Sequence, residues 1–441
     1  MTASGSPARP QLMRAMNEQL LLEHIRAGNG VSRAELARIS GLAKNTVSFA
    51  LANLERASLV RPSGVRTGVP GPAAVLYEVR PEAGFVLGLD VGGQFLRGAI
   101  ADVSGAIRSR SSVKSQATTG HARVAELIAL AGSLVAAAGI SAGDVTQTVV
   151  GSPGVYDPRR DHLALAGGLP GWEKPAVLAE LRRALGPTLM IENDVDAAAL
   201  AEQAHGHGRG VDSFAFVSVG TGIGMGVVLD GRLRRGRHGA AGEIGFLPLV
   251  GVAGAPPGIR RDEGSASEEK DARRRGSLEA AASAAGIVRA ARRAGARGQV
   301  SARQVFRAAA LGEEWAIRVV ADEALLIARA ICAVVTVVDP DLVVLGGGIG
   351  RATGFVDAVA GHLRRLAPVM PDLKVSALGA DAVVDGCLAA GVERAWEIVT
   401  AAIPSALPGD VMTAAAAQLA GSAAADSAGA GSPVAASVQR R

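Results

Sequence analysis

Two patterns of hydrophobic positions divide the chain near residue 80. Over Gln11–Ala27, apolar residues recur with the spacing of one helix face, and a glycine ends the run. After Pro81, short apolar strands alternate with helical segments, which is typical of an α/β domain. We therefore predict a small helical module over residues 11–80 and a larger α/β domain over residues 81–403.

A second helix pattern begins at Ser32, whose spacing to Glu35 is that of a capping box. Gly41 then allows a tight turn into a third helical segment. Small Ala37 and branched Val47 stand on either side of that turn, at the offsets typical of a helix-turn-helix, where they let two helices pack closely. This module is predicted to bind DNA, and a helical docking domain without DNA function is the alternative.

The sequence at the end of the module predicts a wing, because strand-like Leu59–Val60 and Ala74–Val79 flank a loop over residues 61–71. We expect polar side chains of the third helix to reach phosphates and base edges, and wing arginines to reach phosphate or the minor groove. The residues predicted to contact DNA are Arg33, Lys44, Asn45, Thr46, Ser48, Asn53, Arg61 and Arg66. Phe49 on the same helix is expected either to touch a thymine methyl group or to pack inward.

In the larger domain, two predicted hairpins carry glycines at their turns. "FVLGLDV" and "FLRGAIADVSG" predict a hairpin around Gly92–Gly93, and residues 213–236 predict a second one. Backbone N–H groups of such turns can surround phosphate oxygens. "TLMIENDVDAAALAEQAHG" predicts a strand that runs into a helix, with Asn193 and Asp194 at the junction.

Composition adds the charge distribution to this division. Of the 441 residues, 49% are hydrophobic and only 3% aromatic, so the core has to be built from aliphatic residues and alanine. The net charge of +5 is mild, but residues 1–80 hold ten Lys and Arg against five Asp and Glu, a difference of +5. The basic excess therefore lies in the predicted DNA-binding module.

Cysteine usage and hydropathy bear on the compartment. Cys332 and Cys387 are far apart and lack metal-ligand spacing, which excludes a disulfide framework and a cysteine zinc site. The first ten residues lack the apolar segment of a secretion signal, and no uninterrupted apolar run approaches the ~18 residues of a membrane span. We expect a cytoplasmic protein with no membrane partner.

In order along the chain, these motifs resemble those of the ROK family of repressors, uncharacterised reading frames and sugar kinases, over about residues 12 to 400. The resemblance implies an α/β fold of the actin/hexokinase type, with two ribonuclease-H-like lobes around a cleft. The N-lobe is expected at 81–200 and the C-lobe mainly at 201–403. The winged helix-turn-helix in front is what the family's repressors carry and its plain kinases lack.

The resemblance also places sugar-binding groups in the cleft. Asp194 corresponds to the aspartate that takes the proton from the attacking sugar hydroxyl in ROK kinases, beside Asn193, and Glu243 and Glu279 correspond to two further sugar contacts. The alternative is that Asp194 only caps its helix and that both glutamates are solvated. The residues corresponding to the family's two phosphate hairpins are Asp90, Gly92, Gly93, Gly220, Thr221, Gly222 and Gly224.

The first hairpin departs from the kinase pattern. ROK kinases have Gly-Thr there, commonly followed by Lys, whereas this chain has Gln94–Phe95. Phosphoryl transfer depends on positioning and on charge stabilisation, so the loss of a hydroxyl and a cation is costly. We therefore expect no catalytic residues and neither ATP nor magnesium as a cofactor.

The family's zinc motif is also missing. ROK proteins typically place a histidine after Gly-Glu-Ile-Gly and then a CxCGxxGC cluster, which together hold a tetrahedral ion. Here the histidine position is Phe246, and no cysteine lies between it and Glu279. We expect no metal, and a mobile charged loop at residues 251–277 in place of the motif.

Together these features predict a transcriptional regulator, in the first place a repressor, that senses a sugar or sugar derivative in its cleft. It is expected to bind double-stranded operator DNA as a homodimer or homotetramer, because one recognition helix reads too few bases to be selective. Two alternatives stay open: an ATP-dependent sugar kinase that retains a DNA-binding module, and a regulator without a small-molecule effector. Residues 1–10 and the Ala/Ser/Gly-rich tail at 404–441 are expected to be disordered.

Overall fold

The computed structural model describes residues 10–28, 30–66, 74–166, 168–248, 271 and 273–401. The chain divides into two compact units, one built from the N-terminal residues through Arg80 and one spanning Pro81–Val399. The predicted tail and most of the predicted loop at 251–277 lie outside the described residues. Pro10, placed in the predicted disordered segment, is the first residue of a helix.

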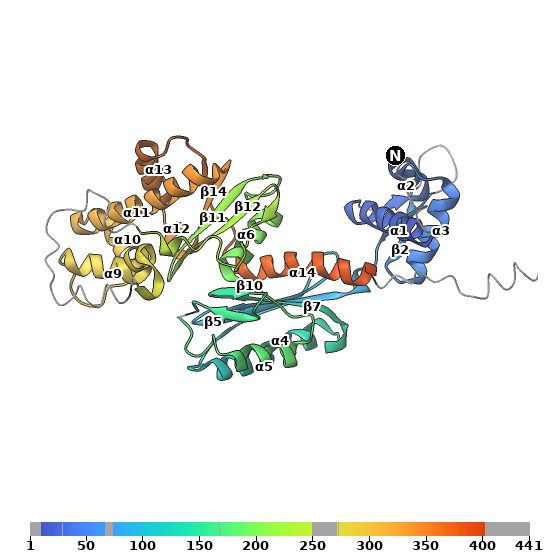
Figure 1. Cartoon of the computed structure of the whole chain (residues 1–441), viewed down its shortest axis with the longest axis horizontal. Coiled ribbons are helices and arrows are strands. Elements are labelled where there is room, and N and C mark those ends of the chain that lie inside the picture. The colour runs from blue at the N-terminus through green and yellow to red at the C-terminus, as the bar shows by residue number, and fades with distance from the viewer. Residues whose placement is uncertain are drawn as a thin grey trace, which may run out of the picture. The chain divides into compact units, whose positions relative to one another are not determined.

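The N-terminal unit contains three helices and a three-stranded antiparallel sheet in the order β1-β3-β2. Its elements, labelled in Figure 1 where there is room, are α1 (Pro10–Ala27), β1 (Val31–Ser32), α2 (Arg33–Ser40), α3 (Lys44–Arg56), β2 (Val60–Arg66) and β3 (Ala74–Val79). The predicted capping box is present, because Ser32 N–H donates to Glu35 at 2.9 Å and Glu35 N–H donates to the Ser32 hydroxyl at 3.3 Å. Gly41 ends α2 with a φ of 70°, a conformation that glycine adopts without strain. Helices α2 and α3, with the turn at Gly41 between them, form the predicted helix-turn-helix.

The wing differs in length from the prediction. Strand β2 runs through Arg66, well into the segment predicted as a loop, and pairs with β3 across an irregularity between Pro62 and Gly64. Strand β2 continues because its backbone pairs with β3 as far as Arg66. The sequence pattern did not predict this continuation, because the β2 side chains beyond Val60 are all exposed.

The second unit contains two five-stranded sheets of the same topology. In each, three antiparallel strands are followed by two strands parallel to the first, and the order is β10-β7-β4-β5-β6 in one sheet and β13-β12-β11-β14-β15 in the other. The first sheet consists of β4 (Phe85–Val91), β5 (Phe95–Asp102), β6 (Ile107–Lys114), β7 (Val145–Ser152) and β10 (Met190–Asn193). The second consists of β11 (Phe214–Val219), β12 (Ile223–Leu229), β13 (Arg232–Leu233), β14 (Leu342–Gly346) and β15 (Asp372–Val375). Both predicted glycine hairpins, β4–β5 and β11–β12, are therefore present at equivalent places.

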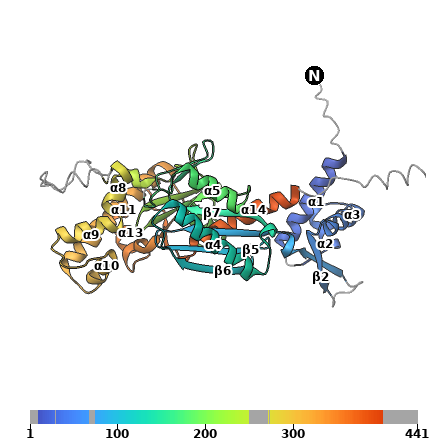
Figure 2. The same ribbon diagram turned by 90° about the horizontal axis from the view of Figure 1, so that it is seen from below.

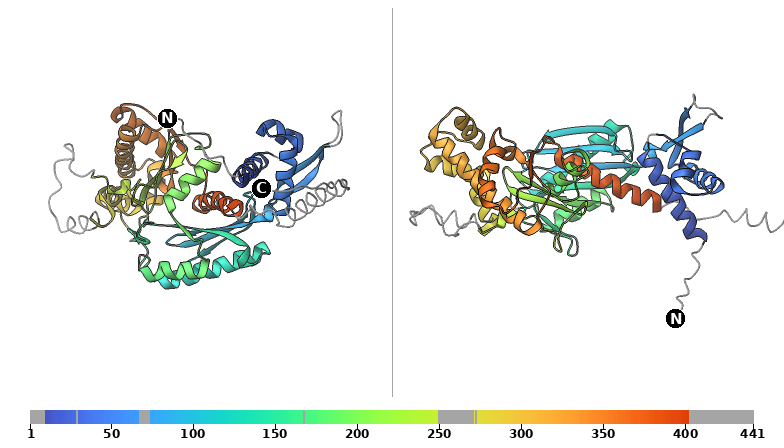
Figure 3. Two further views of the ribbon diagram at one scale, coloured as in Figure 1. Left: turned by 45° about the vertical axis from the view of Figure 1, so that its right-hand side comes forward. Right: turned by 90° about the horizontal axis from the view of Figure 1, so that it is seen from above.

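Helices cover both faces of the first sheet. Alternate residues of β4, among them Leu87 and Leu89, pack with α4 (Gly120–Ala138) and α5 (Pro175–Leu185). On the other face lies α14 (Ala382–Ala401), which Figures 1 and 3 show running along the sheet opposite α4 and α5. Gly88 permits this approach, because a Cβ atom there would lie 3.0 Å from the Leu388 side chain.

Helices also cover the second sheet, and successive side chains of β11 pack against helices on its two opposite faces. Phe214 and Phe216 pack with Ala199 of α6 (Asp194–His205), whereas Val217 and Val219 belong to a core with α11 (Glu314–Val338) and α13 (Phe355–Leu366). Figure 2 shows α11 and α13 in one group with α8, α9 and α10. The remaining elements are η1 (Pro81–Ala83), η2 (Ala142–Asp144), β8 (Val155–Asp157), β9 (His162–Ala164), η3 (Ile244–Phe246), α8 (Ser277–Ala282), α9 (Ala284–Arg293), α10 (Ala302–Ala310) and α12 (Gly347–Gly350).

The predicted division into lobes at residue 200 differs from the packing. Helix α6 begins before that boundary yet covers the second sheet, and α14 returns to the first sheet from the C-terminal end of the domain. The two helices cross closely, since a Cβ atom at Gly386 would lie 1.7 Å from the Ala197 carbonyl oxygen. Each lobe thus takes a helix from the sequence of the other.

Among the described helices, α4 is long and apolar enough, by length and composition, to cross a membrane. The sequence interpretation expected no such segment. Val124, Leu127 and Leu134 of α4 pack in the core of the first lobe, and core helices satisfy the same criterion. Helix α4 also carries the buried Arg123.

Candidate functional site

The junction between β10 and α6 fixes the side chains of Asn193 and Asp194. Asn193 is the N-cap: its Oδ1 accepts from the N–H groups of Val195 at 2.8 Å and Asp196 at 3.1 Å. Its Nδ2 donates to the Gly154 carbonyl at 3.0 Å, which ties the junction to the loop after β7. The cap is therefore Asn193, and the alternative role of Asp194 as the helix cap is not what the geometry shows.

Five acidic residues are connected by charge interactions, in each of which one carboxylate raises the pKa of another, and we call them the carboxylate cluster: Asp90, Asp194, Asp196, Glu243 and Glu279. Burial is the largest cause for each. It raises the pKa to about 7 for Asp90 and Glu243, with Asp194 adding to both. The pKa of Asp196 rises to about 8 and those of Asp194 and Glu279 also rise. The structure thus brings the predicted sugar-binding carboxylates together with Asp90 of the first hairpin.

The first hairpin holds its carboxylate with an internal cation. Arg97 Nη1 lies 3.0 Å from Asp90 Oδ2, and the Arg97 guanidinium stacks 5.4 Å from the centre of the Phe95 ring. At the turn, the Gly92 N–H donates to the Phe95 carbonyl at 3.1 Å, and the Gly92 carbonyl accepts from Arg123 at 2.9 Å. Gly92 is therefore hydrogen-bonded within the protein on both sides, and Asp90 already has a positive partner.

The second hairpin is contacted by a carboxylate. Glu279 Oε2 accepts the N–H of Ile223 at 2.9 Å, and its Oε1 lies 3.7 Å from Arg275. The Gly220 N–H donates to the Gly222 carbonyl at 2.9 Å, while Thr221 at the tip is exposed. A phosphate bound at this turn would lie beside the negative charge of Glu279, which disfavours an anion there.

A second arginine pairs with a buried acid next to the cluster. The Arg235 guanidinium donates from Nε to both carboxylate oxygens of Glu192, at 3.0 and 2.9 Å. Asp196 is 3% exposed, and its Oδ1 has no hydrogen-bond partner among the described residues. Since an uncompensated buried charge is unfavourable, burial and Glu192 together raise the Asp196 pKa.

On the N-terminal unit, α3 presents a polar face. Lys44, Asn45 and Ser48 are exposed and Thr46 is partly buried, whereas Val47 is fully buried on the opposite face. These four are the predicted DNA contacts whose side chains lie on the helix surface. Their role stays a prediction.

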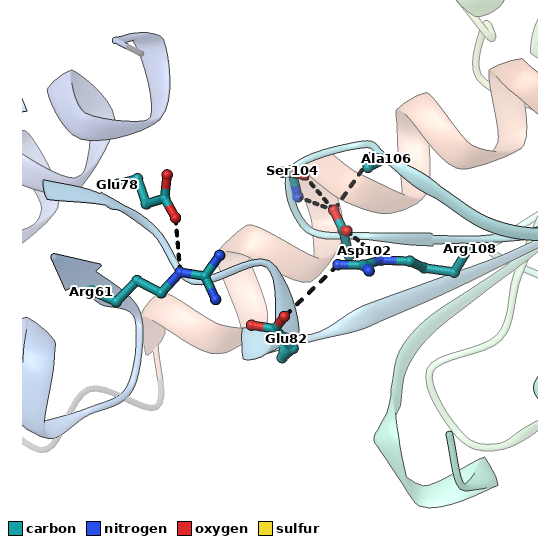
Figure 4. A network of polar contacts seen from close by, with 7 residues as sticks. All are labelled: Arg61, Glu78, Glu82, Asp102, Ser104, Ala106 and Arg108. Carbon is teal, nitrogen blue, oxygen red and sulfur yellow. Dashed lines mark hydrogen bonds and ion pairs between the residues drawn. The ribbon is translucent and has the colours of Figure 1, made fainter. Parts of the chain in front are cut away.

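The other four predicted DNA contacts take part in interactions within the unit. Arg33 donates to the Tyr77 hydroxyl at 2.5 Å, Arg66 pairs with Glu35 at 2.5 Å, and Asn53 donates to Glu18 at 2.7 Å. Figure 4 shows Arg61 directed at Glu78, with 2.8 Å between Nε and Oε1. The same figure shows a separate network of the larger unit, in which the Asp102 carboxylate accepts from Ser104, Ala106 and Arg108 and closes the turn after β5.

No group of three or more His, Cys, Asp and Glu side chains in the described part of the chain could hold a metal ion. Phe246 lies in η3 and is 40% exposed. Residues 251–270 of the predicted loop are not described, but Arg273–Arg275 at its end are helical and Gly276 precedes α8. The last part of that predicted loop is thus ordered, because Arg275 pairs with Asp271 one helical turn earlier at 2.7 Å.

The ROK family model matches residues 86–390 of the chain. The chain belongs to the ROK family. It is 40% identical over 204 residues to the bifunctional enzyme NanE/NanK of Brucella suis, and the aligned region is 46% of this chain and 34% of the relative. The chain thus spans about a third of the length of the first curated relatives it matches. The xylose repressor of Bacillus subtilis is 26% identical over 237 residues, 54% of this chain and 61% of the repressor.

Solved ROK structures have the same fold. A ROK hexokinase from Thermus thermophilus is 30% identical with a TM-score of 0.59, covering 71% of this chain and 99% of its own. A ROK transcriptional regulator that is a homologue of the E. coli MLC protein is 22% identical with a TM-score of 0.69, covering 89% and 98%. The predicted family and the predicted actin/hexokinase-like α/β fold are confirmed, and the relatives include both repressors and sugar kinases.

In this ROK chain, sequence reasoning missed two partners of predicted acids, an ion pair beside the cluster and one acid of the cluster itself: Arg97 and Arg275, Arg235 with Glu192, and Asp196. One of them had a readable signal. Asp90 and Arg97 are directly opposite in the β4–β5 register, so counting back from the glycine turn predicts a cross-strand ion pair. Arg235 had no such signal, because it lies after β13 and its partner Glu192, in β10, is 43 residues away in the sequence.

Proposed function

We propose that the chain is a transcriptional regulator that binds operator DNA through α3 and the wing and senses a sugar or sugar derivative at the carboxylate cluster. The observation that carries this proposal is the exposed polar face of α3, in a module that precedes the ROK domain and holds the basic excess of the chain. Buried Val47, Leu51 and Leu54 fix the helix to its unit, so the polar face is free to lie against a duplex.

The two hairpins support sensing over catalysis. Asp90 is paired with Arg97, and the second hairpin carries the Glu279 carboxylate, so neither turn offers the cation-lined, unoccupied backbone that a phosphate requires. Asp194, Glu243 and Glu279 would accept hydrogen bonds from sugar hydroxyls, as the resemblance implies for their counterparts in the family, and Asn193 would add a donor and an acceptor.

Regulation would work by linkage between the sugar and the DNA. The cluster draws residues from β4 of the first sheet, from α6, from the residue before η3 and from α8. A bound sugar would therefore favour one arrangement of the two lobes over another. Such control requires that the sugar bind the two arrangements with unequal affinity. In a homodimer or homotetramer, the lobe arrangement would set the spacing of two recognition helices on a pseudo-palindromic operator.

The test is a binding titration of the full chain on the DNA upstream of its own coding region, repeated with each member of a panel of hexoses and N-acetylhexosamines. Lys44→Ala should weaken binding and reduce the salt slope by about one phosphate contact. Lys114→Ala, an exposed lysine of β6, is the matched control and should leave both unchanged. Equal affinity of the wild-type chain for upstream DNA and random competitor contradicts the proposal.

A second candidate function, an ATP-dependent sugar kinase, is favoured by two observations. The NanE/NanK relative and the ROK hexokinase carry enzyme names, and Asp194 has a raised pKa, as a general base acting near neutral pH needs. Release of ADP in the presence of a sugar, abolished by Asp194→Asn, would support this candidate. A regulator without a small-molecule effector would instead bind DNA with no sugar effect.

A further inference from the structure

Phe49 is an apolar residue on the polar face of α3. Its side chain is 49% exposed, and exposed Asn45 lies one helical turn earlier on the same face. The inward face of the same helix is already filled by Val47, Ala50 and Leu51, all buried. Phe49 is therefore not needed for the core of the unit.

A basic side chain of α1 contacts the Phe49 ring. The Arg14 guanidinium of α1 lies 5.5 Å from the ring centre, a cation–π distance that restricts the ring's orientation, and Lys44 begins the same helix. An exposed apolar ring beside a cation, on a helix that begins with a second cation, suits a partner that has both an anionic backbone and a small apolar group. A duplex offers both, as phosphates and as the thymine 5-methyl group in the major groove.

We propose that Phe49 determines part of the operator sequence by contacting the 5-methyl group of a thymine in each half-site. This inference rests on the proposed DNA-binding function and names one base that the helix reads. Thymine is the base that carries a methyl group in the major groove, and a phenyl ring can read it without any hydrogen bond. Arg14 holds the ring in place beside the phosphate backbone.

The probe is a duplex selected by the full wild-type chain from a random-sequence DNA pool. Each thymine of the selected duplex is then replaced in turn by uracil, which removes the methyl group and leaves base pairing unchanged. The affinities of wild type, Phe49→Ala, Phe49→Leu and Lys44→Ala are measured on every duplex. Thermal unfolding of each variant confirms that it is folded, which is expected because Phe49 is half exposed.

Wild type should lose about fourfold in affinity at one thymine per half-site, the equivalent of one desolvated methyl group. Phe49→Ala should bind the parent duplex more weakly and show no loss at that uracil. Phe49→Leu should keep part of the loss, and Lys44→Ala should keep all of it while binding every duplex more weakly.

Two results overturn the inference while leaving the proposed function intact. One is a wild-type chain that is indifferent to every uracil replacement, and the other is Phe49→Ala with the same uracil sensitivity as wild type. A change of oligomeric state in Phe49→Ala, with uracil sensitivity absent, assigns the ring to a second copy of the chain. If the pool yields no enriched sequence at all, the proposed function fails and the inference fails with it.

Discussion

The β4–β5 and β11–β12 hairpins occupy equivalent places in two sheets of the same topology, yet their turns differ in charge. At the first turn a cation, Arg97, is paired with the buried Asp90. At the second turn an anion, Glu279, accepts a backbone N–H. One architecture has therefore been filled by the protein's own side chains in two opposite ways.

Under the proposed function, this difference would close a phosphate site without a change of fold. The strands, register and glycines of both hairpins are present, because backbone pairing depends on the sheet and not on the ligand. We propose that side chains that add an internal ion to each turn remove the electrostatic reason for a nucleotide to bind. The carboxylate cluster would still accept hydrogen bonds from sugar hydroxyls.

The largest expected effect concerns pH and the first hairpin. Asp90 has a folded-state pKa raised to about 7, above its ordinary 3.8, so its ionisation opposes folding at pH values above the unfolded value. The free energy of unfolding should fall as pH rises from about 4 to 7, by about 4 kcal/mol for this group. Denaturant unfolding followed by tryptophan fluorescence measures this fall in the ROK domain, which holds Trp172, Trp315 and Trp396.

The variants that isolate this contribution are Asp90→Asn and Arg97→Met. Asp90→Asn should flatten the pH dependence, although Glu243 and Asp196 continue to contribute because their pKa values are also raised. Arg97→Met removes the cation that lowers the Asp90 pKa, so the fall should extend to higher pH. A slope that is the same in Asp90→Asn and wild type contradicts the assignment.

The next effect compares two adjacent glycines of the first turn. A Cβ atom at Gly92 would lie 2.6 Å from the Phe95 carbonyl oxygen, so Gly92→Ala forces a backbone shift and should lower the free energy of unfolding by about 2 kcal/mol. At Gly93 no heavy atom lies within 4 Å, and Gly93→Ala should change it by less than about 0.5 kcal/mol. Equal losses would mean that the turn is not closed as described.

The smallest effect is expected at the second turn. A Cβ atom at Gly222 would lie 2.9 Å from Glu279 Oε2, which belongs to a side chain that can move. Gly222→Ala should therefore change stability less than Gly92→Ala does. It should raise the sugar concentration for half-maximal release of DNA by about threefold, because Glu279 loses the N–H that orients it. An unchanged midpoint would remove Glu279 from the sugar site.

Local sequence patterns predicted several elements of the fold. The capping box at Ser32, the turn at Gly41 and both glycine hairpins depend on local spacing, and each was confirmed. The positions of α6 and α14 were not predicted, because the close approach of Gly386 to Ala197 joins segments nearly two hundred residues apart. No local pattern records such a crossing.

Most acids of the carboxylate cluster were predicted, whereas Asp196 and the arginines around the cluster were missed. Asp194, Glu243 and Glu279 could be placed by resemblance, and the structure brings them together. The sequence does not distinguish Arg235 and Arg275 from the other arginines of this Arg-rich chain. What distinguishes them is the ion pairs that they form with Glu192 and Asp271 in the folded structure. In the N-terminal unit, Lys44 and Arg61 are both exposed, and it is the ion pair with Glu78 that distinguishes Arg61.

The most direct measurement is a coupled ADP-release assay on wild-type protein that has been shown to bind its selected duplex, with ATP, magnesium and each sugar of the panel. We expect no sugar-dependent ADP release, while at least one sugar changes the affinity for the duplex. Sugar-dependent turnover that Asp194→Asn abolishes would contradict the claim that the two hairpins have been closed to phosphate.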